Sequence, residues 1–312
     1  MSYADKLFVQ NCKDILENGT DTKGQAVRPH WPDGESAYTI KKFGIVNRYR
    51  PAEEFPALTL RKTAIKSAFQ EILWIFQKKS NNIHDLGLHI WDQWADETGS
   101  IGTAYGYQIG KKYIHHKIKG QADVADKIVT CGLYPSVELQ YDSEKDVTYV
   151  WMDQMDGVLY DLKHTPYNRR VMTSLWNFDD LHTMRLQPCC WNLTFNVTDE
   201  GKDKLVLNMI MNQRSQDTLA ANNWNVVQYS LLLMAVAQIC NMIPGEFVHV
   251  IADMHIYDRH VPIIKELIKR PQYDAPKVTL DPSITDFYKF TKDSIIMEDY
   301  KCGEQVTFEV AE

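Results

Sequence analysis

The second half of the chain combines strand-like segments with one long apolar helix, and this pattern most constrains the fold. Four segments are rich in β-branched and aromatic side chains, which is typical of strands. They cover residues 171–176, 191–197, 205–212 and 246–252. We predict a long apolar helix over residues 223–241 and a shorter amphipathic one over residues 261–269. These segments predict an α+β (α/β) fold, with a large mixed β-sheet covered by helices.

Two helices are predicted in the first half of the chain. The first covers residues 3–17, with Gly19 just past its end. The second covers residues 62–79, where four apolar side chains fall within about 60° of one another at 100° per residue. They are Ile65, Phe69, Ile72 and Phe76. Glu71 lies at the edge of that apolar face, where we expect its carboxylate to be partly desolvated.

The chain is long enough for one large domain. It has 312 residues, and 44% of them are hydrophobic, which supplies a substantial core. No internal repeat, low-complexity tract or Gly/Ser linker marks a boundary, so we expect one domain over residues 1–312. The stretch 113–153 is charged and weakly periodic, and we expect it to be an insertion.

Charge, hydropathy and cysteine usage exclude several classes of protein. A formal net charge of −7 argues against a protein that grips duplex nucleic acid. The most apolar stretch, residues 229–240, is shorter than the roughly 18 residues of a membrane span. The N-terminus has no signal-peptide pattern. Six cysteines without a Cys-x-x-Cys pair indicate reduced thiols in a cytoplasmic protein.

A cysteine behind a proline is the first candidate for chemistry. Cys189 follows Pro188 at the start of a predicted strand. A thiolate is a strong nucleophile, and positive charge nearby lowers the pKa of a thiol. Arg214 would supply that charge if its strand lies beside the strand that Cys189 leads. A cysteine entering a strand is more often a small buried hydrophobic residue, so both interpretations stay open on this motif alone.

Several arginines lie in polar surroundings, and they suit an anionic ligand. A phosphate dianion prefers several guanidinium groups together with a hydroxyl. The candidates are Arg28, Arg169, Arg170, Arg214 and Ser215. His255 and Tyr257 alternate along a predicted strand end and would face the same way. No residue cluster has zinc-ligand spacing and no Gly-rich phosphate loop is present, so no metal site is expected.

A series of longer motifs runs through nearly the whole chain. They are Glu71-Ile72-Leu73-Trp74, Ile90-Trp91-Asp92-Gln93-Trp94-Ala95-Asp96, Tyr105-Gly106, Asn168-Arg169-Arg170, Pro188-Cys189, Gln213-Arg214-Ser215-Gln216-Asp217 with Asn225, Pro244-Gly245-Glu246-Phe247 and Asp253-Met254-His255-Ile256-Tyr257. In order and spacing these motifs resemble those of the thymidylate synthase family. With Arg28 near the start, the resemblance covers all but the stretch 113–153.

The resemblance implies the thymidylate synthase fold and a methyltransferase reaction. The enzyme would convert deoxyuridylate (dUMP) to thymidylate (dTMP), with 5,10-methylenetetrahydrofolate as donor of both the one-carbon unit and the hydride. No metal takes part. It also implies a homodimer with shared active sites, because the family's arginine pair, here Arg169 and Arg170, reaches across the interface.

The resemblance also assigns roles to individual residues. The catalytic residues would be Cys189, Glu71, Asn225 and Tyr105. The nucleotide would be bound by Arg28, Arg169, Arg170, Arg214, Ser215, Gln216, Asp217, Asn225, His255 and Tyr257. The folate would contact Asp217, Trp91 and Ala311.

A few positions depart from the family pattern. The family usually has Leu-Gly-x-Pro-Phe-Asn where this chain has Ala220-Ala221-Asn222-Asn223-Trp224-Asn225. Other departures are Ala64 and Cys190, where the family has histidines, Ala252, where it has glycine, and the final Glu312. They leave two alternatives open: a dUMP or dCMP hydroxymethyltransferase on the same scaffold, and a silent nucleotide- or RNA-binding protein. Retention of both Cys189 and Glu71 argues against the silent protein.

Overall fold

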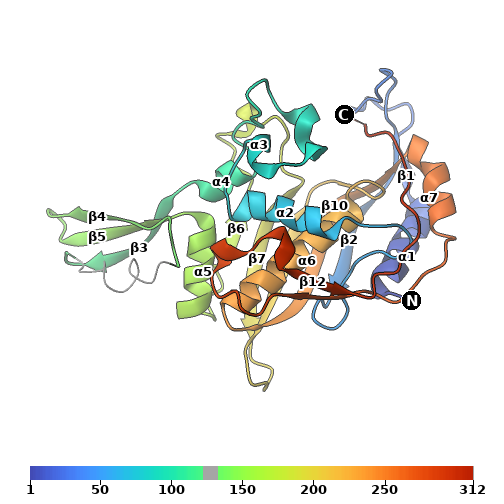
Figure 1. Ribbon diagram of the computed structural model, residues 1–312. Coiled ribbons are helices and arrows are strands. Elements are labelled where there is room, and N and C mark those ends of the chain that lie inside the picture. Colours follow the sequence, from blue (N-terminus) through green and yellow to red (C-terminus); the bar gives the residue numbers. More distant parts are fainter. Residues whose placement is uncertain (122–132, 312) are drawn as a thin grey trace.

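The computed structural model describes residues 1–121 and 133–311 and contains helices on a central sheet (Figure 1). The helices are α1 (Tyr3–Asn18), α2 (Ile65–Phe76), α3 (Ile83–Leu86), α4 (Gly106–Gly110), α5 (Gln154–His164), α6 (Asn222–Ile239) and α7 (Val261–Leu267). The strands are β1 (Thr20–Asp21), β2 (Thr39–Tyr49), β3 (Tyr113–Lys119), β4 (Glu138–Asp142), β5 (Val147–Met152), β6 (Met172–Ser174), β7 (Cys190–Thr198), β8 (Val206–Gln213), β9 (Gln216–Asp217), β10 (Ile243–Tyr257), β11 (Lys277–Leu280) and β12 (Ile295–Glu298).

The central sheet is mixed, as the sequence predicts. Its strand order is β1-β2-β10-β8-β7-β6, and β9 pairs with the end of β10. β10 runs parallel to β8 and β9, while the neighbouring pairs β2–β10, β7–β8 and β6–β7 are antiparallel. α6 packs against β8 and β10, and α2 packs on α6. The predicted fold class is therefore confirmed.

The predicted elements are present with shifted bounds. α1 and α6 match the expected helices closely, and the strands predicted at 191–197 and 205–212 are β7 and β8. The helix expected over residues 62–79 is shorter, because residues 61–64 are held by contacts with the start of α6 and Lys79 has a left-handed backbone. All four residues of its predicted apolar face are at most 2% exposed.

One face of the sheet carries exposed apolar side chains on two of its strands. Met172 on β6 pairs with Thr194 on β7, which pairs with Ile210 on β8, which pairs with Val248 on β10. Residues directly opposite each other in a sheet point to the same face. Met172 is 49% exposed and Ile210 is 40% exposed. Thr194 between them is polar and Val248 is buried, so this face presents exposed apolar side chains on β6 and β8.

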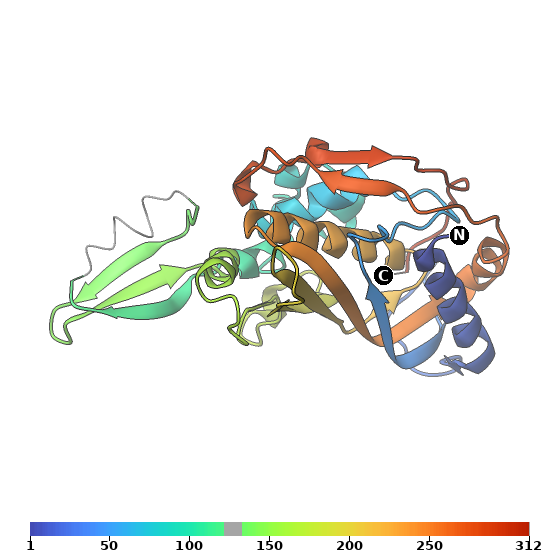
Figure 2. The same cartoon turned by 90° about the horizontal axis from the view of Figure 1, so that it is seen from below.

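A second, three-stranded sheet with the order β3-β5-β4 projects from the body of the molecule (Figures 1 and 2). It occupies the stretch predicted as an insertion, of which residues 122–132, with Cys131, lie outside the described residues. At its base a charged contact joins Lys79 to Asp153, and Ser136 donates to the Asp156 carboxylate at 2.5 Å. The division into one domain with an insertion stays a prediction.

The packing of α2 predicts a large difference between two variants. Phe69 is fully buried and packs edge-on against Phe290, with ring centroids 6.2 Å apart. We expect Phe69→Ala to lower the free energy of unfolding by about 3–5 kcal/mol through lost burial and a cavity. Lys66→Ala removes only an exposed ion pair with Asp293 and should cost less than about 1 kcal/mol. Urea unfolding at a fixed protein concentration measures both, and equal losses would contradict the packing.

Candidate active site

Cys189 lies directly before β7, at the edge where β8 ends. The backbone N–H of Arg214 donates to the Cys189 carbonyl at 2.9 Å, because β7 and β8 are antiparallel neighbours. The Arg214 guanidinium lies 3.8 Å from the Cys189 sulfur and also donates to the Gln187 and Pro188 carbonyls at 2.8 and 3.1 Å. The expected pairing of thiol and arginine is therefore present.

The net pKa of the Cys189 thiol differs from the simple expectation. Burial raises it above the ordinary value, and the positive charges of Arg214 and Arg28 only partly offset that effect. The sequence indicated that arginine charge acts on the thiol. How strongly burial raises the thiol pKa depends on the tertiary structure. The arginines therefore limit the rise of the thiol pKa rather than lower the pKa outright.

Cys190 points away from this edge into the core. It is 4% exposed, and burial raises its pKa well above the usual range. Successive side chains of a strand alternate between faces, so Cys190 cannot share the position of Cys189. Its surroundings are those of a structural thiol.

Glu71 is a buried carboxylate held by two tryptophans. It is 6% exposed and lies on the side of α2 that faces α6. The indole N–H of Trp91 donates to Oε1 at 2.7 Å, and the indole N–H of Trp224 donates to Oε2 at 2.5 Å. Burial raises the Glu71 pKa to about 7, against hydrogen bonds from Trp91, Trp224 and Gln228 that lower it. Such a pKa suits a group that exchanges protons near neutral pH.

Tyr105 links the carboxylate side of the site to the thiol side. Its ring lies edge-on to Trp91 at 4.9 Å, and its hydroxyl accepts the Cys189 backbone N–H at 3.4 Å. Its backbone has φ 47° and ψ −106°, a conformation that is costly for a residue with a side chain. A Cβ on the following Gly106 would lie 2.1 Å from the Ser80 carbonyl oxygen, so only glycine fits there.

Asn225 is oriented by neighbouring amides. Its Oδ1 accepts from Gln213 at 3.1 Å, and its Nδ2 donates to Gln228 at 3.1 Å. Gln213 in turn is paired through Oε1 with the ring of the fully buried His249 at 2.6 Å. These contacts fix the orientation of the Asn225 side-chain amide, and with it the directions of its N–H donor and its carbonyl acceptor. Gln216, a predicted substrate residue, has a buried side chain that donates to Gln213 at 3.4 Å.

His255 and Tyr257 lie together on β10, as predicted. Their rings meet edge-on at 5.1 Å, and His255 Nδ1 lies 2.8 Å from the Asp253 carboxylate. Burial raises the Tyr257 pKa to about 12, and the charges of Asp217, Arg28, Cys189 and Asp253 also act on it. Tyr257 is therefore a neutral phenol within electrostatic range of the thiol and Arg28.

The C-terminal segment runs past Asp217. Asp217 Oδ1 accepts the backbone N–H groups of Leu219 and Ala220 at 2.9 and 3.1 Å and lies 3.7 Å from the His260 ring. The other side of the His260 ring contacts the Glu309 carbonyl at 2.8 Å. Ala311 is half-buried beyond it, whereas Glu312 lies outside the described residues.

The structure does not bring all predicted residues together within one chain. Arg28 is exposed but acts electrostatically on Cys189, and Ser215 follows Arg214 at the same edge. Arg169 and Arg170 are exposed on the loop between α5 and β6. In the described part of this chain, no hydrogen bond or ion pair joins them to the Cys189 edge.

Three contributors were missed by sequence reasoning. Trp224 was noted only as a departure from the family pattern, and Gln228 and His260 were not assigned. Trp224 could have been found from its chemistry, because tryptophan in place of the family's phenylalanine keeps an aromatic ring and adds an N–H donor. Gln228 follows Asn225 by one helical turn, a spacing that brings side chains together.

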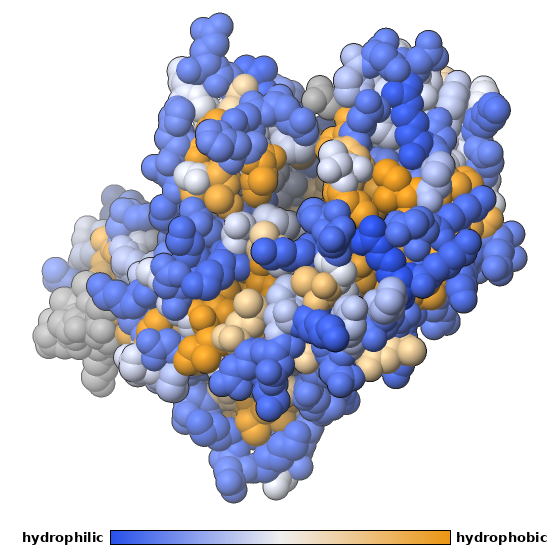
Figure 3. All heavy atoms as spheres, turned by 45° about the vertical axis from the view of Figure 1, so that its right-hand side comes forward, coloured by the Kyte–Doolittle hydropathy of each residue, from blue (hydrophilic) through white to orange (hydrophobic). Residues whose placement is uncertain are grey.

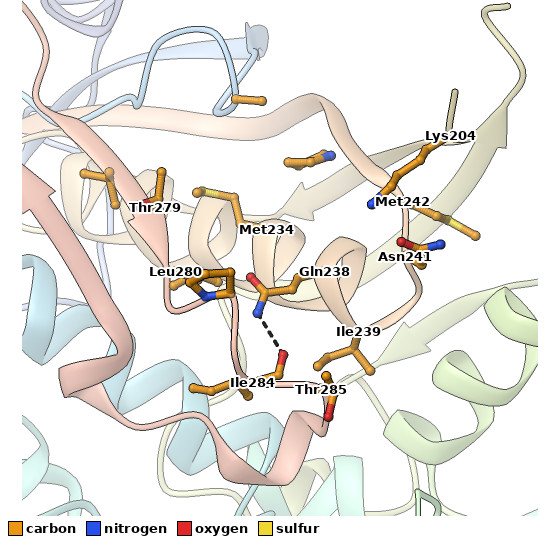
Figure 4. A pocket seen from close by; sticks show the side chains of 14 residues that line it. Lys204, Met234, Gln238, Ile239, Asn241, Met242, Thr279, Leu280, Ile284 and Thr285 are labelled. Atoms are coloured by element: carbon orange, nitrogen blue, oxygen red, sulfur yellow. Dashed lines mark hydrogen bonds between the residues drawn. The ribbon is translucent and has the colours of Figure 1, made fainter. Parts of the chain in front are cut away.

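Two hollows of the surface differ in character. Figure 3 shows an indentation between two lobes at the upper edge of the molecule, with hydrophobic residues on its walls. A separate cavity of about 620 Å³ lies near the C-terminal end of α6, and Figure 4 shows Met234, Gln238, Ile239 and Leu280 along it. The side-chain amide of Gln238 donates there to the Asp281 and Ile284 backbone carbonyls. None of the candidate residues lines this second cavity.

Among residues 1–121 and 133–311, no group of three His, Cys, Asp or Glu side chains could hold a metal ion. In the same described ranges, no helix is long and apolar enough to cross a bilayer.

Comparison with known proteins identifies the family. The family model for thymidylate synthase matches residues 6–312. A thymidylate synthase of Bacillus licheniformis is 38% identical over the full length of both chains, and thymidylate synthase 1 of Bacillus subtilis (strain 168) is 36% identical over the full length of both. The solved thermostable thymidylate synthase A from Bacillus subtilis superposes with a TM-score of 0.82 at 35% identity, covering 99% of each chain.

Fold and site define an enzyme of the methyltransferase class. The chain belongs to the thymidylate synthase family. The comparisons lend no support to the hydroxymethyltransferase alternative.

The two adjacent cysteines should differ in reactivity. We expect iodoacetamide to alkylate the half-buried Cys189 before Cys190, because Cys190 is buried and its pKa is higher. Arg214→Gln should slow the alkylation of Cys189 several-fold, since loss of the positive charge raises the thiol pKa further. Arg50→Gln, which removes only an exposed pair with Glu53, is the control. Peptide mapping by mass spectrometry at pH 8 measures the rates, and an unchanged rate for Arg214→Gln would contradict the electrostatic assignment.

Proposed function

We propose that this enzyme converts dUMP to dTMP by reductive methylation, with 5,10-methylenetetrahydrofolate as co-substrate and dihydrofolate as second product. The observation that carries the proposal is one compact arrangement. The Cys189 thiol lies beside Arg214, and the Tyr105 hydroxyl accepts the Cys189 backbone N–H. The Tyr105 ring packs on Trp91, which donates to Glu71, a buried carboxylate with a pKa of about 7. A nucleophile and a proton carrier held this way suit covalent catalysis on a heterocyclic base.

Cys189 is the nucleophile in this proposal. Its thiolate adds to carbon 6 of uracil, and the electrons of the carbon 5–carbon 6 double bond move to an enolate at oxygen 4. Carbon 5 then takes the methylene group of the folate. Loss of the carbon-5 proton then breaks the bond between the methylene group and the folate nitrogen, which leaves an exocyclic methylene on carbon 5. Hydride transfer from the released tetrahydrofolate to this methylene expels the thiolate and restores the ring double bond, giving dTMP and dihydrofolate. The positive charges of Arg214 and Arg28 favour the thiolate at both ends of the cycle.

Glu71 and Asn225 would act on the uracil ring. The Glu71 carboxylate would take the carbon-5 proton through bound water, and its pKa of about 7 allows it to release that proton to solvent afterwards. The Asn225 amide offers one acceptor and one donor, which complement the N3–H and O4 of uracil. Its hydrogen bonds to Gln213 and Gln228 support that role, because they limit rotation of the amide.

The phosphate and sugar would be bound along the sheet edge. Arg28, Arg214 and Ser215 supply two positive charges and a hydroxyl for the phosphate. His255 and Tyr257 would contact the deoxyribose hydroxyl. Gln216 and Asp217 would contribute to the nucleotide site mainly through the backbone and through neighbouring side chains, since the Gln216 side chain is buried.

Arg169 and Arg170 would act in a second copy of the chain. Only Val171 separates them from β6, the edge strand that carries the exposed Met172. The exposed apolar side chains of Met172 and Ile210, which lie on the same face of the sheet, support a homodimer packed through that face. In that dimer each site would receive the arginine pair of the partner.

The folate would lie against Trp91, Asp217 and the C-terminal Ala311. Trp91 offers an aromatic wall, and the C-terminal segment passes Asp217 through its contact with His260. A segment closed over the folate would exclude water from the reactive one-carbon unit. We also propose a cytoplasmic location, since the five described cysteines are free thiols.

Product analysis tests this proposal. The protein is incubated with dUMP and 5,10-methylenetetrahydrofolate, the nucleotide mass is measured, and dihydrofolate is followed by absorbance. We expect dTMP and dihydrofolate in equal amounts, and no product from Cys189→Ser, because serine is not ionised near neutral pH. A 5-hydroxymethyl nucleotide without dihydrofolate would overturn the proposal.

Shared active sites predict complementation between inactive chains. Mixing Cys189→Ala with Arg170→Ala should restore activity, because a hybrid dimer has one site with an intact Cys189 and an intact Arg170 from its partner. Mixing Cys189→Ala with Glu71→Ala should restore none, since both groups belong to the same chain's half of a site. Absence of recovery in the first mixture, with subunit exchange proven by mass spectrometry, would refute the shared site.

Base selectivity should depend on Asn225. Asn225→Asp replaces a donor–acceptor pair by acceptors, which mismatches O4 of uracil and suits the amino group of cytosine. A site built on such hydrogen bonds discriminates by up to ~10⁴-fold. We expect the variant to lose dUMP turnover and to gain activity on dCMP relative to the parent. Measured kcat/KM for both nucleotides decides this, and an unchanged preference would mean that Asn225 does not read the base.

A further inference from the structure

The second tryptophan on Glu71 comes from the segment that departs from the family pattern. Trp224 stands where the family usually has phenylalanine, and its indole N–H donates to Glu71 Oε2 at 2.5 Å. Trp91 donates to the other oxygen, Oε1, at 2.7 Å. The two carboxylate oxygens of Glu71 therefore each receive one indole N–H, from elements far apart in the sequence.

The start of α6 is fixed so that Trp224 holds this position. The Arg61 guanidinium donates to the Leu219 carbonyl and, at 2.9 Å, to Asn223 Oδ1. Asn223 Nδ2 in turn donates to Thr63 Oγ1 at 2.9 Å. Arg61 and Asn223 are buried, at 3% and 4% exposure. The residue before Trp224 is thus tied to the segment that leads into α2, the helix of Glu71.

We infer that Trp224 is a positioning residue for Glu71, which with Trp91 holds the buried carboxylate in one orientation and in its charged form at the start of proton transfer. The inference rests on the proposed function, since it assigns Trp224 to the step that Glu71 serves. Trp224 itself need not touch the substrate for this role.

The physical reason lies in the kind of donor. A buried carboxylate needs hydrogen bonds to remain ionised, and a nearby cation would lower its pKa far below neutrality. Indole N–H groups are neutral donors, so they offset part of the burial without supplying a charge. The outcome is the Glu71 pKa of about 7, where the same group can both accept and release a proton.

Trp224→Phe isolates the N–H, because the aromatic ring is kept. Losing a donor to the charged carboxylate disfavours the charged form, so the Glu71 pKa rises. Turnover is followed as release of the carbon-5 hydrogen of dUMP. We expect the acid limb of the kcat–pH profile to move up by about one pH unit, which corresponds to a tenfold change in the ionisation equilibrium of Glu71. At pH 7 kcat should fall several-fold, while KM for dUMP stays within about twofold.

Trp74→Phe is the matched control. Trp74 lies on α2 one turn after Glu71, is fully buried and contacts the Trp91 ring, but its indole N–H donates to the Asn82 carbonyl at 3.0 Å. The Trp74→Phe variant should have a lower free energy of unfolding and an unchanged acid limb of the kcat–pH profile. If both variants lower stability equally and neither moves the limb, Trp224 is only a packing residue and the inference is wrong.

A double-mutant cycle and a spectroscopic titration complete the test. In a Glu71→Gln background, Trp224→Phe should cause no further loss of kcat, whereas an independent structural role predicts additive losses. Infrared difference spectra against Glu71→Gln report the protonated carboxyl directly, without turnover, and should show the raised pKa in Trp224→Phe. If the parent enzyme makes no dTMP, the proposed function fails, and the infrared titration still decides the role of Trp224.

Discussion

The antiparallel pairing of β7 with β8 is the contact on which the site depends. In an antiparallel pair the start of one strand lies beside the end of the other, so Cys189 and Arg214 meet at one edge of the sheet. The backbone bond from Arg214 to the Cys189 carbonyl fixes that meeting at 2.9 Å. Because β10 runs parallel to β8, its last residues, His255 and Tyr257, extend to the same edge. One strand register thus collects a thiol, a cation and two hydrogen-bonding side chains from three distant parts of the sequence.

The packing of α2 on α6 supplies the other half of the site. The apolar face of α2 turns Glu71 toward α6, where a carboxylate could not remain without partners. The first turn of α6 provides both Trp224, which bonds this carboxylate, and Asn225, which faces the Gln213 network of the sheet. Consecutive residues of a helix point about 100° apart, so one turn can serve two different neighbours. In the proposed function, the start of α6 therefore couples proton transfer to base recognition.

The sequence predicted the elements whose side chains follow a clear burial period. α2, α6, β7 and β8 were found because one side or the whole element is buried. β2 and β3 were missed, since both have mostly half-buried or exposed side chains and so lack a clean alternation. The family resemblance located Cys189 and Glu71, but two features required the tertiary structure. These are the burial that raises the Cys189 pKa and the second indole on Glu71, because neither depends on residues near in sequence.

Two departures from the family pattern, Cys190 and Trp224, fall around Glu71, the proposed proton-transfer group. Recognition of a dianion needs fixed charges, so an arginine cannot be replaced without loss of Coulomb energy. The ionisation of a buried carboxylate instead depends on the number and direction of neutral donors, which can change one at a time. Cys190 replaces a titratable histidine by a buried thiol that ionises far above neutral pH, and Trp224 adds a donor that carries no charge. Around Glu71, burial raises the pKa values of Tyr105 and Tyr229 well above their usual range, whereas the Glu71 pKa is about 7. Burial raises the Glu71 pKa and the neutral donors lower it again, so each indole hydrogen bond adjusts the pH at which this carboxylate ionises.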